Sequence, residues 1–346
     1  MSASRLRLPL RVALVILTAL IAIAGPLHAR DVTPYIERRE VTAFANEIAT
    51  LHRLDRASVL NAFREARHQP AIIRAMEPVQ PGQRSWQQYR SRTVTPTRTE
   101  DGVQFWAQHR DALARAEERF GIPPEVIVAI IGVETNYGRN TGSWRVLDAL
   151  TTLAFDYPRR GAFFRTELAQ LFLYAKETGT DVAALRGSFA GAVGIPQFMP
   201  GSFMRYAIDF DGDGRRDLVT NVTDAIGSVG NFLAQHGWRA NEPVAFRVAV
   251  DGDAHTLPLS AGIEPRFRIG ELDQYGITLT EPLDEDAWCA LIEFDTPNAE
   301  SEFWIGLANF YVITRYNQSS FYAMSVHALA QVLKTQMSAP VPRAGP

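Results

Sequence analysis

The residue best placed for acid chemistry is Glu134, because it extends an otherwise apolar helix face. Ile127, Ile130 and Ile131 precede it at helical spacing. No Lys, Arg or His occupies the turn just before it, so burial is expected to raise its pKa. A carboxyl group that stays protonated near neutral pH can donate a proton to a leaving group. The alternative is a helix-end Glu that only holds a loop in place.

A second polar feature is the glycine-rich segment 187–200, in which Ser188 and Gln197 are the polar side chains. Small residues let backbone come close to a ligand or to another helix. The segment is therefore either a tightly packed turn or part of a binding site. Together with a buried acid, it suits a polar polymer such as a glycan.

The third feature is an acidic loop that has the pattern of an EF-hand. Oxygen ligands are expected at loop positions 1, 3, 5 and 7, with glycine at position 6. The ligand positions hold Asp209, Asp211, Asp213 and Arg215 (through its carbonyl), and position 6 holds Gly214. Position 12 holds Thr220 instead of Glu, and Asp217 is a spare candidate. The alternative is an acidic surface turn. A cation is favoured because three alternating carboxylates otherwise repel one another.

Length and composition indicate an ordinary globular protein. The 346 residues allow two or three structural units. Arg5, Arg7 and Arg11 precede an apolar run over 12–24, and Ala29 ends a candidate cleavage site, so residues 1–29 are predicted to be a signal peptide. A cut after Ala24 and an uncleaved anchor are the alternatives, although the run is short for a membrane span.

The mature chain is expected to be acidic and free of disulfides. Removing residues 1–29 changes the formal net charge from −3 to −6, which gives no support to nucleic-acid binding. Cys289 is the only cysteine, so no intramolecular disulfide and no lipidated N-terminus are expected. Cys289 is interpreted as a buried structural thiol. We expect an exported, periplasmic protein that is soluble and not lipidated.

These side chains must be positioned by a mainly helical chain. Pro124 is expected to begin the Glu134 helix, and Asp55 to cap the N-terminus of another. A polar connection is expected over 78–99, in which Trp86 and Tyr89 either stack on a sugar or pack on their own domain. The remaining periodicity predicts helices over 55–67, 102–120, 161–176, 224–235, 302–316 and 322–336, and strands over 246–250 and 290–294.

Several separated motifs resemble those of a known family. They are Gly132–Thr135, Tyr157–Arg160, Gly187–Ala192, Gln197–Pro200, Asp224–Ser228 and Arg315–Asn317. Their order over residues 31–335 closely resembles that of peptidoglycan lytic transglycosylases of the membrane-bound B type. The resemblance implies an α+β, mainly α fold with a lysozyme-like catalytic core, an extra helical domain and a small inserted β domain.

The implied domains follow the changes in pattern along the chain. A helical domain is expected over 31–118, and the lysozyme-like core with its EF-hand-like loop over 119–240 and 297–335. The small β domain is expected over 241–296 and a flexible tail over 336–346.

The resemblance also implies roles for individual residues. Glu134 matches the single catalytic acid, and Asp224 matches the last acidic ligand of a structural calcium site. The residues implied to line the glycan cleft are Ser188, Gln197, Tyr316, Asn317 and Tyr322, with Arg159 and Arg160 at its rim. The alternative is that Tyr316 and Tyr322 are core aromatics and that the two arginines lie on a solvated face.

The activity implied is cleavage of the β-1,4 bond between N-acetylmuramic acid and N-acetylglucosamine, with formation of 1,6-anhydromuramic acid. No cofactor is expected for the chemistry. The expected partners are peptidoglycan glycan strands and cell-wall synthesis or remodelling proteins, with the enzyme a monomer. A lysozyme-like hydrolase that uses the same acid with water is one alternative, and a non-catalytic glycan-binding scaffold is another. Ordinary glycosidases need a second carboxylate, for which a distant acid such as Asp156 is a candidate.

Overall fold

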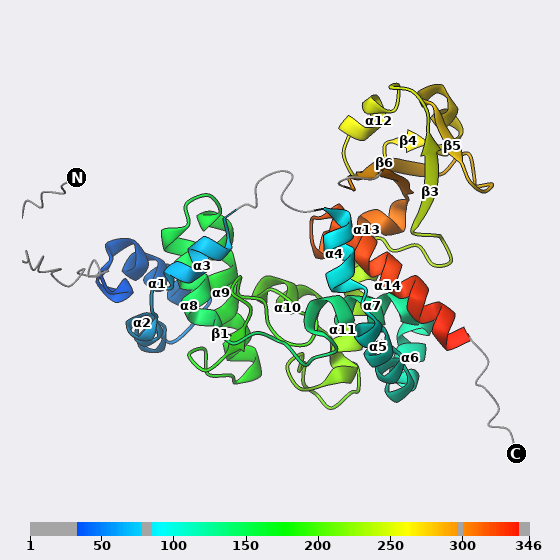
Figure 1. Ribbon diagram of the computed structural model, residues 1–346. Coiled ribbons are helices and arrows are strands. Elements are labelled where there is room, and N and C mark those ends of the chain that lie inside the picture. The colour runs from blue at the N-terminus through cyan, green and yellow to red at the C-terminus, as the bar shows by residue number, and fades with distance from the viewer. Residues whose placement is uncertain (1–32, 78–84, 297–299, 339–346) are drawn as a thin grey trace, which may run out of the picture. The chain divides into compact units, whose positions relative to one another are not determined.

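The computed structural model describes residues 33–77, 85–296 and 300–338 (Figure 1). The predicted signal peptide therefore lies outside the described residues. Among the residues that are described, no helix has the length and apolar character needed to cross a bilayer. The predicted tail begins too early, because helix α14 (Ser320–Ser338) continues through 336–338.

The N-terminal helices pack on one another and on a later helix. They are η1 (Tyr35–Glu37), α1 (Arg39–Leu51), α2 (Arg56–Glu65) and α3 (Pro70–Ala75). The predicted cap of α2 is confirmed, because the Ser58 backbone N–H donates to Asp55 Oδ2 at 2.8 Å. Helix α3 packs on α8 (Val146–Asp156), which in turn packs on α9 (Gly161–Thr178) (Figure 1).

The next helices pack on different partners. They are α4 (Trp86–Thr93), α5 (Pro96–Gln108) and α6 (Arg110–Phe120). Helices α4 and α5 contact α14, while α5 and α6 contact α7 (Pro124–Thr135). The described residues within 31–118 thus contribute to two packing groups. Sequence periodicity identifies a buried helix face but not the partner that covers it, and the domain boundary stays a prediction.

Two details of this region differ from the sequence analysis. The polar connection over 78–99 contains helix α4, where the Ser85 side chain accepts the Gln88 N–H as a cap. Trp86 is 2% exposed, and its ring centroid lies 5.0 Å from that of Phe294, so it packs on its own protein. The single helix predicted over 102–120 is two helices, because His109 leaves helical geometry at φ −114° and ψ 24°.

Helix α7 lies at the centre of a group of packed helices. It contacts α5, α6, α14 and α11 (Val222–Gln235). Its residues from Pro124 to Gly132 are buried without interruption, and all of them except Glu125 are apolar or glycine, as expected of a helix that is largely hydrophobic all round. Each fully buried isoleucine contributes about 1.5–3 kcal/mol. The helix is therefore a rigid support for the residues at its end.

The predicted β unit is a five-stranded antiparallel sheet in the order β4-β6-β7-β3-β5. Its strands are β3 (Ala245–Val250), β4 (Phe267–Arg268), β5 (Ile277–Leu279), β6 (Trp288–Phe294) and β7 (Glu302–Gly306), with α12 (Thr256–Ser260) and η2 (Ile269–Tyr275) between them. Cys289 is fully buried there, and burial raises the pKa of its thiol to about 12. The structural reading of this cysteine is confirmed.

The prediction of a helix over 302–316 is wrong for residues 302–306. Residues 302–306 form β7, which pairs with both β3 and β6, and α13 begins only at Ala308 and ends at Tyr316. The sheet therefore extends past residue 296, the predicted end of the β unit. A short apolar run such as Phe303–Ile305 fits either period, and cross-strand pairing decides the outcome.

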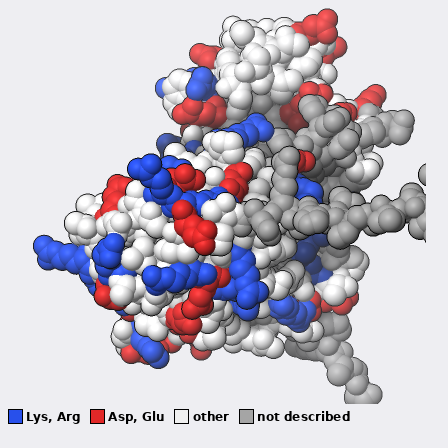
Figure 2. Space-filling view, turned by 90° about the vertical axis from the view of Figure 1, so that its left-hand side faces the viewer, with Lys and Arg blue, Asp and Glu red and all other residues white. Residues whose placement is uncertain are grey.

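Charged side chains are mixed on the face of the molecule that carries the N-terminal helices. In Figure 2, Lys and Arg alternate with Asp and Glu over the residues shown there. Nucleic-acid binding needs a basic patch or stripe. This face gives it no support, in agreement with the negative formal charge.

Candidate active site and metal-binding loop

Glu134 lies in the last turn of α7, where the helix is stopped by two residues in the left-handed region. Asn136 has φ 50° and Tyr137 has φ 62°. The Glu134 side chain is half-buried, and Tyr322 Oη donates to its Oε1 at 2.7 Å. Burial raises the pKa of Glu134 to about 7, although the tyrosine hydrogen bond opposes this rise. No charged side chain among the described residues contributes to the shift.

Two stacked tyrosines form one side of the site. Tyr322, on α14, is 2% exposed, and its ring lies 6.3 Å from that of Tyr316 at an interplanar angle of 15°. Tyr316, at the end of α13, donates from Oη to the Pro196 carbonyl at 2.6 Å. Burial raises the pKa of both phenols well above the usual value. Both therefore remain neutral donors, and Tyr322 is directed at the acid.

The glycine-rich segment is fixed to the end of α7. Thr135 Oγ1 donates to the Ile195 carbonyl at 2.8 Å. Gln197, at φ 52°, donates from Nε2 to the carbonyls of Gly194 (2.9 Å) and Thr141 (3.0 Å). These bonds bring Gln197 and the Glu134 helix together. Sequence reasoning missed Thr135, although its place directly after the acid was the available signal.

Ser188 joins the same region through close backbone packing. Its Oγ accepts the Ala192 N–H at 3.0 Å. A Cβ on Gly142, which has φ 94°, would lie 2.2 Å from the Gly187 carbonyl carbon and 2.6 Å from the Ser188 nitrogen. Only glycine fits at this position. The contact sits at the short sheet formed by β1 (Trp144–Arg145) and β2 (Arg186–Gly187).

The remaining predicted cleft residues are less closely connected. Asn317 is exposed and ends α13 in an extended conformation. Arg159 and Arg160 are exposed before α9, and the Arg160 guanidinium lies 4.4 Å from the Phe163 ring centre. No hydrogen bond or ion pair among the described residues joins either arginine to Glu134. Their place at the rim stays a prediction.

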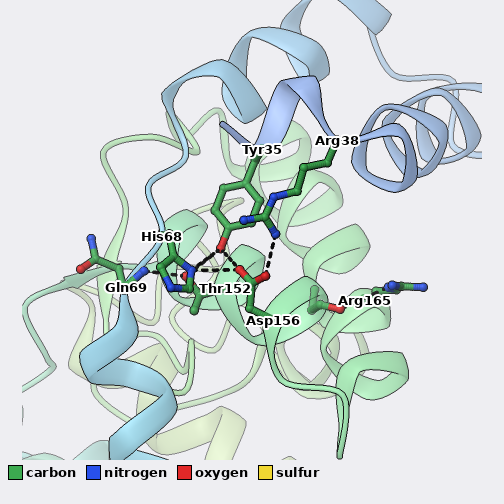
Figure 3. A network of polar contacts seen from close by, with 8 residues as sticks. Tyr35, Arg38, His68, Gln69, Thr152, Asp156 and Arg165 are labelled. Carbon is green, nitrogen blue, oxygen red and sulfur yellow. Dashed lines mark hydrogen bonds and ion pairs between the residues drawn. The ribbon is translucent and has the colours of Figure 1, made fainter. Parts of the chain in front are cut away.

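The distant candidate for a second carboxylate, Asp156, is occupied elsewhere (Figure 3). Its Oδ2 accepts Tyr35 Oη at 2.5 Å and lies 2.9 Å from His68 Nδ1, while Arg38 reaches Oδ1 at 2.6 Å. These partners come from η1 and from the segments beside α1 and α3. Asp156 therefore fastens the N-terminal helices to α8, a role that the sequence did not reveal.

The acidic loop brings three carboxylates together. Oxygen atoms of Asp209, Asp211 and Asp213 lie within 4.8 Å of one another. Asp209 also accepts the N–H groups of Gly212 at 2.7 Å and Gly214 at 2.8 Å, which holds the loop closed around the group. This set of oxygen donors, partly open to solvent, fits a calcium ion.

Asp224 occupies a different place from the other predicted ligands. It is fully buried in the first turn of α11 and lies outside the group of three. Its Oδ1 accepts the Phe210 N–H and its Oδ2 the Asp217 N–H, both at 2.8 Å. Asp224 therefore ties both ends of the loop to the helix. Asp217 accepts N–H groups from Val219 and Thr220.

A mainly helical fold presents one desolvated carboxylic acid beside a glycine-rich loop, an arrangement that suits acid-catalysed cleavage of a glycan. Residues 37–331 match the transglycosylase SLT domain family, and the chain belongs to this family. It is 41% identical over 299 residues to membrane-bound lytic murein transglycosylase B of Escherichia coli (strain K12), a match that covers 84% of this chain and 81% of that protein.

Solved structures agree with this assignment. The soluble lytic transglycosylase SltB1 of Pseudomonas aeruginosa is similar with a TM-score of 0.81 and 42% identity, over 87% of this chain and 100% of that one. The Escherichia coli lytic transglycosylase Slt35 in complex with calcium is similar with a TM-score of 0.80 and 39% identity, over 88% and 95% of the two chains. The predicted family and the lysozyme-like fold class are confirmed.

Proposed function

We propose that this protein is a peptidoglycan lytic transglycosylase in which Glu134 is the only catalytic carboxyl group. The observation that carries the proposal is the environment of Glu134, which is desolvated and bonded to a neutral tyrosine, and whose pKa is not shifted by a charged side chain among the described residues. A pKa near 7 lets one group act first as acid and then as base. The murein-cleaving relatives support the choice of substrate.

The first step breaks the glycosidic bond. Protonated Glu134 donates its proton to the oxygen that bridges C1 of N-acetylmuramic acid and N-acetylglucosamine, and the C1–O bond breaks. The substrate's own N-acetyl group stabilises the positive charge at C1. Because Tyr322 donates to Oε1, Oε2 is the oxygen left to carry the transferable proton.

The second step closes the new ring without water. Glu134, now a carboxylate, accepts the proton of the muramic C6 hydroxyl. The C6 oxygen attacks C1 and forms the 1,6-anhydro product. Glu134 ends the cycle protonated, so that no second carboxylate is required, in contrast to ordinary glycosidases.

The other cleft residues are proposed to bind and orient the glycan. Tyr322 is a positioning residue for the acid, and Tyr316 supports Tyr322 by stacking. Gln197 and Ser188 border the site through the glycine-rich segment, and Asn317 extends it at the end of α13. Arg159 and Arg160 are proposed for the rim.

A structural calcium ion is proposed for the acidic loop. Asp209, Asp211 and Asp213 would supply carboxylate oxygens and Arg215 its carbonyl, while Asp224 would act through the backbone that it holds. The ion would stabilise the loop and take no part in the chemistry. The calcium complex of the related Slt35 supports this proposal.

Export through the signal peptide at 1–29, without lipidation, is proposed from the sequence, together with a periplasmic location. The peptidoglycan substrate lies outside the cytoplasm, which agrees with export.

The test of the proposed function is mass spectrometry of the products released from purified sacculi. A lytic transglycosylase releases muropeptides that are lighter by one water molecule than the products of a hydrolase. Anhydro ends are expected to predominate. Reducing ends as the main product would contradict the proposal and leave the lysozyme-like hydrolase, while an intact sacculus that still binds the protein would leave the glycan-binding scaffold.

A further inference from the structure

A hollow of about 560 Å³ lies where the β unit meets α13 and the segment that follows α11, outside the site that contains Glu134. We call it the Trp288 hollow. The side chains that matter for its chemistry come from four stretches of the chain and are His236, Arg239, Glu264, Arg266, Trp288 and Tyr311. Its volume is within the range of small-ligand sites.

Trp288 is the least expected residue in this hollow. It begins β6 and is 47% exposed, whereas tryptophan is highly buried on average. Arg268, its partner on β4, places its guanidinium 4.4 Å from the ring centre. The ring is thus held on one side by a cation–π contact. Its remaining surface is available to a ligand.

Another part of the lining, which includes Arg239 and Tyr311, is held by hydrogen bonds within the protein. Asn309 is fully buried and exchanges hydrogen bonds of 2.8 Å with the backbone N–H and carbonyl of Arg239. Tyr311 lies on α13 and accepts a hydrogen bond from Arg315 at 3.4 Å. An ordered wall lowers the entropic cost of binding.

The charges around the hollow are paired. Arg266 donates two hydrogen bonds to Glu264 Oε2, at 2.7 and 3.3 Å. Arg239 lies 3.4 Å from Glu242. Because each of these two cations has a carboxylate partner, the hollow favours neither a strongly anionic nor a strongly cationic ligand. It offers fixed donors and acceptors beside an aromatic surface.

A pyranose ring has the matching chemistry. Its axial C–H groups form an apolar face that can lie on an indole. Its hydroxyl groups, at the edge of the ring, can form hydrogen bonds with a guanidinium–carboxylate pair such as Arg266 and Glu264. We propose that the Trp288 hollow is a second binding site for the neutral N-acetylhexosamine units of a glycan strand. The proposal rests on the proposed function only for the identity of the polymer.

The position of the hollow gives this second site a use. Tyr311 and Tyr316 lie on the same helix, α13, and Tyr316 stacks on the tyrosine that binds Glu134. A strand held in the hollow stays near the cleft after a cut, which raises the effective concentration of the next bond. The benefit applies to polymers and not to fragments too short to occupy both sites.

The test is co-sedimentation with two insoluble polymers, intact sacculi and peptide-free chitin. Every protein carries Glu134→Gln, so that the polymers are not cleaved during the measurement. Trp288→Ala is expected to weaken binding to both polymers roughly three- to tenfold. Trp288→Phe should retain most of the binding. Leu257→Ala, which removes an apolar side chain that is 58% exposed in the same β unit, is the matched control and should bind like the parent.

The outcomes separate this proposal from its competitors. Unchanged binding of a Trp288→Ala protein that melts like its parent would overturn it. A loss on sacculi but not on chitin would overturn it as well, because the occupant would then be a stem peptide. With Glu134 intact, Trp288→Ala should raise KM on sacculi and leave turnover of short soluble fragments unchanged. Wild-type protein that fails to cleave sacculi while Trp288-dependent binding persists would contradict the proposed function alone.

Discussion

At the scale of single residues, the raised pKa of Glu134 results from burial that is offset by few groups able to stabilise its carboxylate form. A half-buried carboxylate usually gains a cation or several N–H donors, each of which lowers its pKa. Glu134 has one phenol donor at 2.7 Å, and its pKa is raised to about 7. A group with this pKa is close to evenly divided between acid and base near neutral pH, as two-step proton transfer requires.

Glu134→Gln is expected to keep the fold and glycan binding but to lose cleavage, because the amide preserves shape and cannot deliver a proton. The loss should be at least about a hundredfold in turnover of sacculi. Glu125→Gln is the matched control, since Glu125 is a buried carboxylate on the same helix that pairs with Lys334 at 3.2 Å. Near-normal turnover by the folded Glu134 variant would refute the assignment of the acid.

Tyr322→Phe is expected to shift the alkaline limb of the pH–rate profile upward. The Tyr322 hydroxyl stabilises the carboxylate form and so lowers the pKa of Glu134. Its removal should raise that pKa by about one unit, and the protonated acid should persist to higher pH. Tyr316→Phe loses a bond to the Pro196 carbonyl instead and should leave the limb in place. A downward shift of the limb in the Tyr322→Phe variant would contradict this role.

At the scale of elements, the site depends on how helices and loops end. Helix α7 stops at Asn136, where the Asn136 N–H bonds the Gly132 carbonyl at 3.1 Å and the left-handed turn sends the chain toward the glycine-rich segment. Thr135 then anchors that segment at Ile195. The acid and its binding loop are therefore fixed by the same turn.

The acidic loop gives the element-scale prediction. Calcium should raise the melting temperature by several degrees, because an ion that binds only the native state stabilises it by mass action. Replacing both Asp209 and Asp213 by Ala should abolish the shift. The matched control is the same double change at Asp251 and Asp253, which flank Gly252 in another acidic turn. Identical melting of the intact protein with calcium and with chelator would count against the site.

Local chemistry explains which elements were predictable. Helix α7 and the strands β3 and β6 have strong sequence patterns, and Asp55 is a clear cap. Helix α4 was missed because its sequence is polar and it is held by Trp86, whose partners Phe294 and Phe321 lie far away in the chain. The local sequence of strand β7 fits a helix equally well, because its pairing with β3 and β6 depends on residues far away in the chain.

Local sequence patterns predict only part of the candidate site as well. Burial of Glu134 followed from the isoleucines before it, whereas its tyrosine partner lies 188 residues away. The pairing of Tyr322 with the acid could not be read from spacing, and the tyrosine entered the candidate site through the family resemblance. Asp156 shows the converse, since an acid that looked available is held by Tyr35, Arg38 and His68.

At the scale of the whole molecule, a single carboxyl group is proposed to do the work of two. The chain belongs to the transglycosylase SLT domain family, and the described residues give Glu134 no carboxylate neighbour that affects its pKa. The proposed mechanism therefore assigns no second base to a water molecule near C1. In the proposed mechanism the nucleophile is the C6 hydroxyl of the substrate, and Glu134 is the base that accepts its proton.

Digestion of sacculi in water enriched in oxygen-18 tests this claim most directly. If Glu134 accepts the proton of the C6 hydroxyl and that oxygen attacks C1, the new muramic ends are anhydro ends without solvent oxygen. Mass spectrometry should then find unlabelled products. Predominantly reducing ends that carry oxygen-18 at C1 would mean that water is the nucleophile, and they would contradict the transglycosylase account.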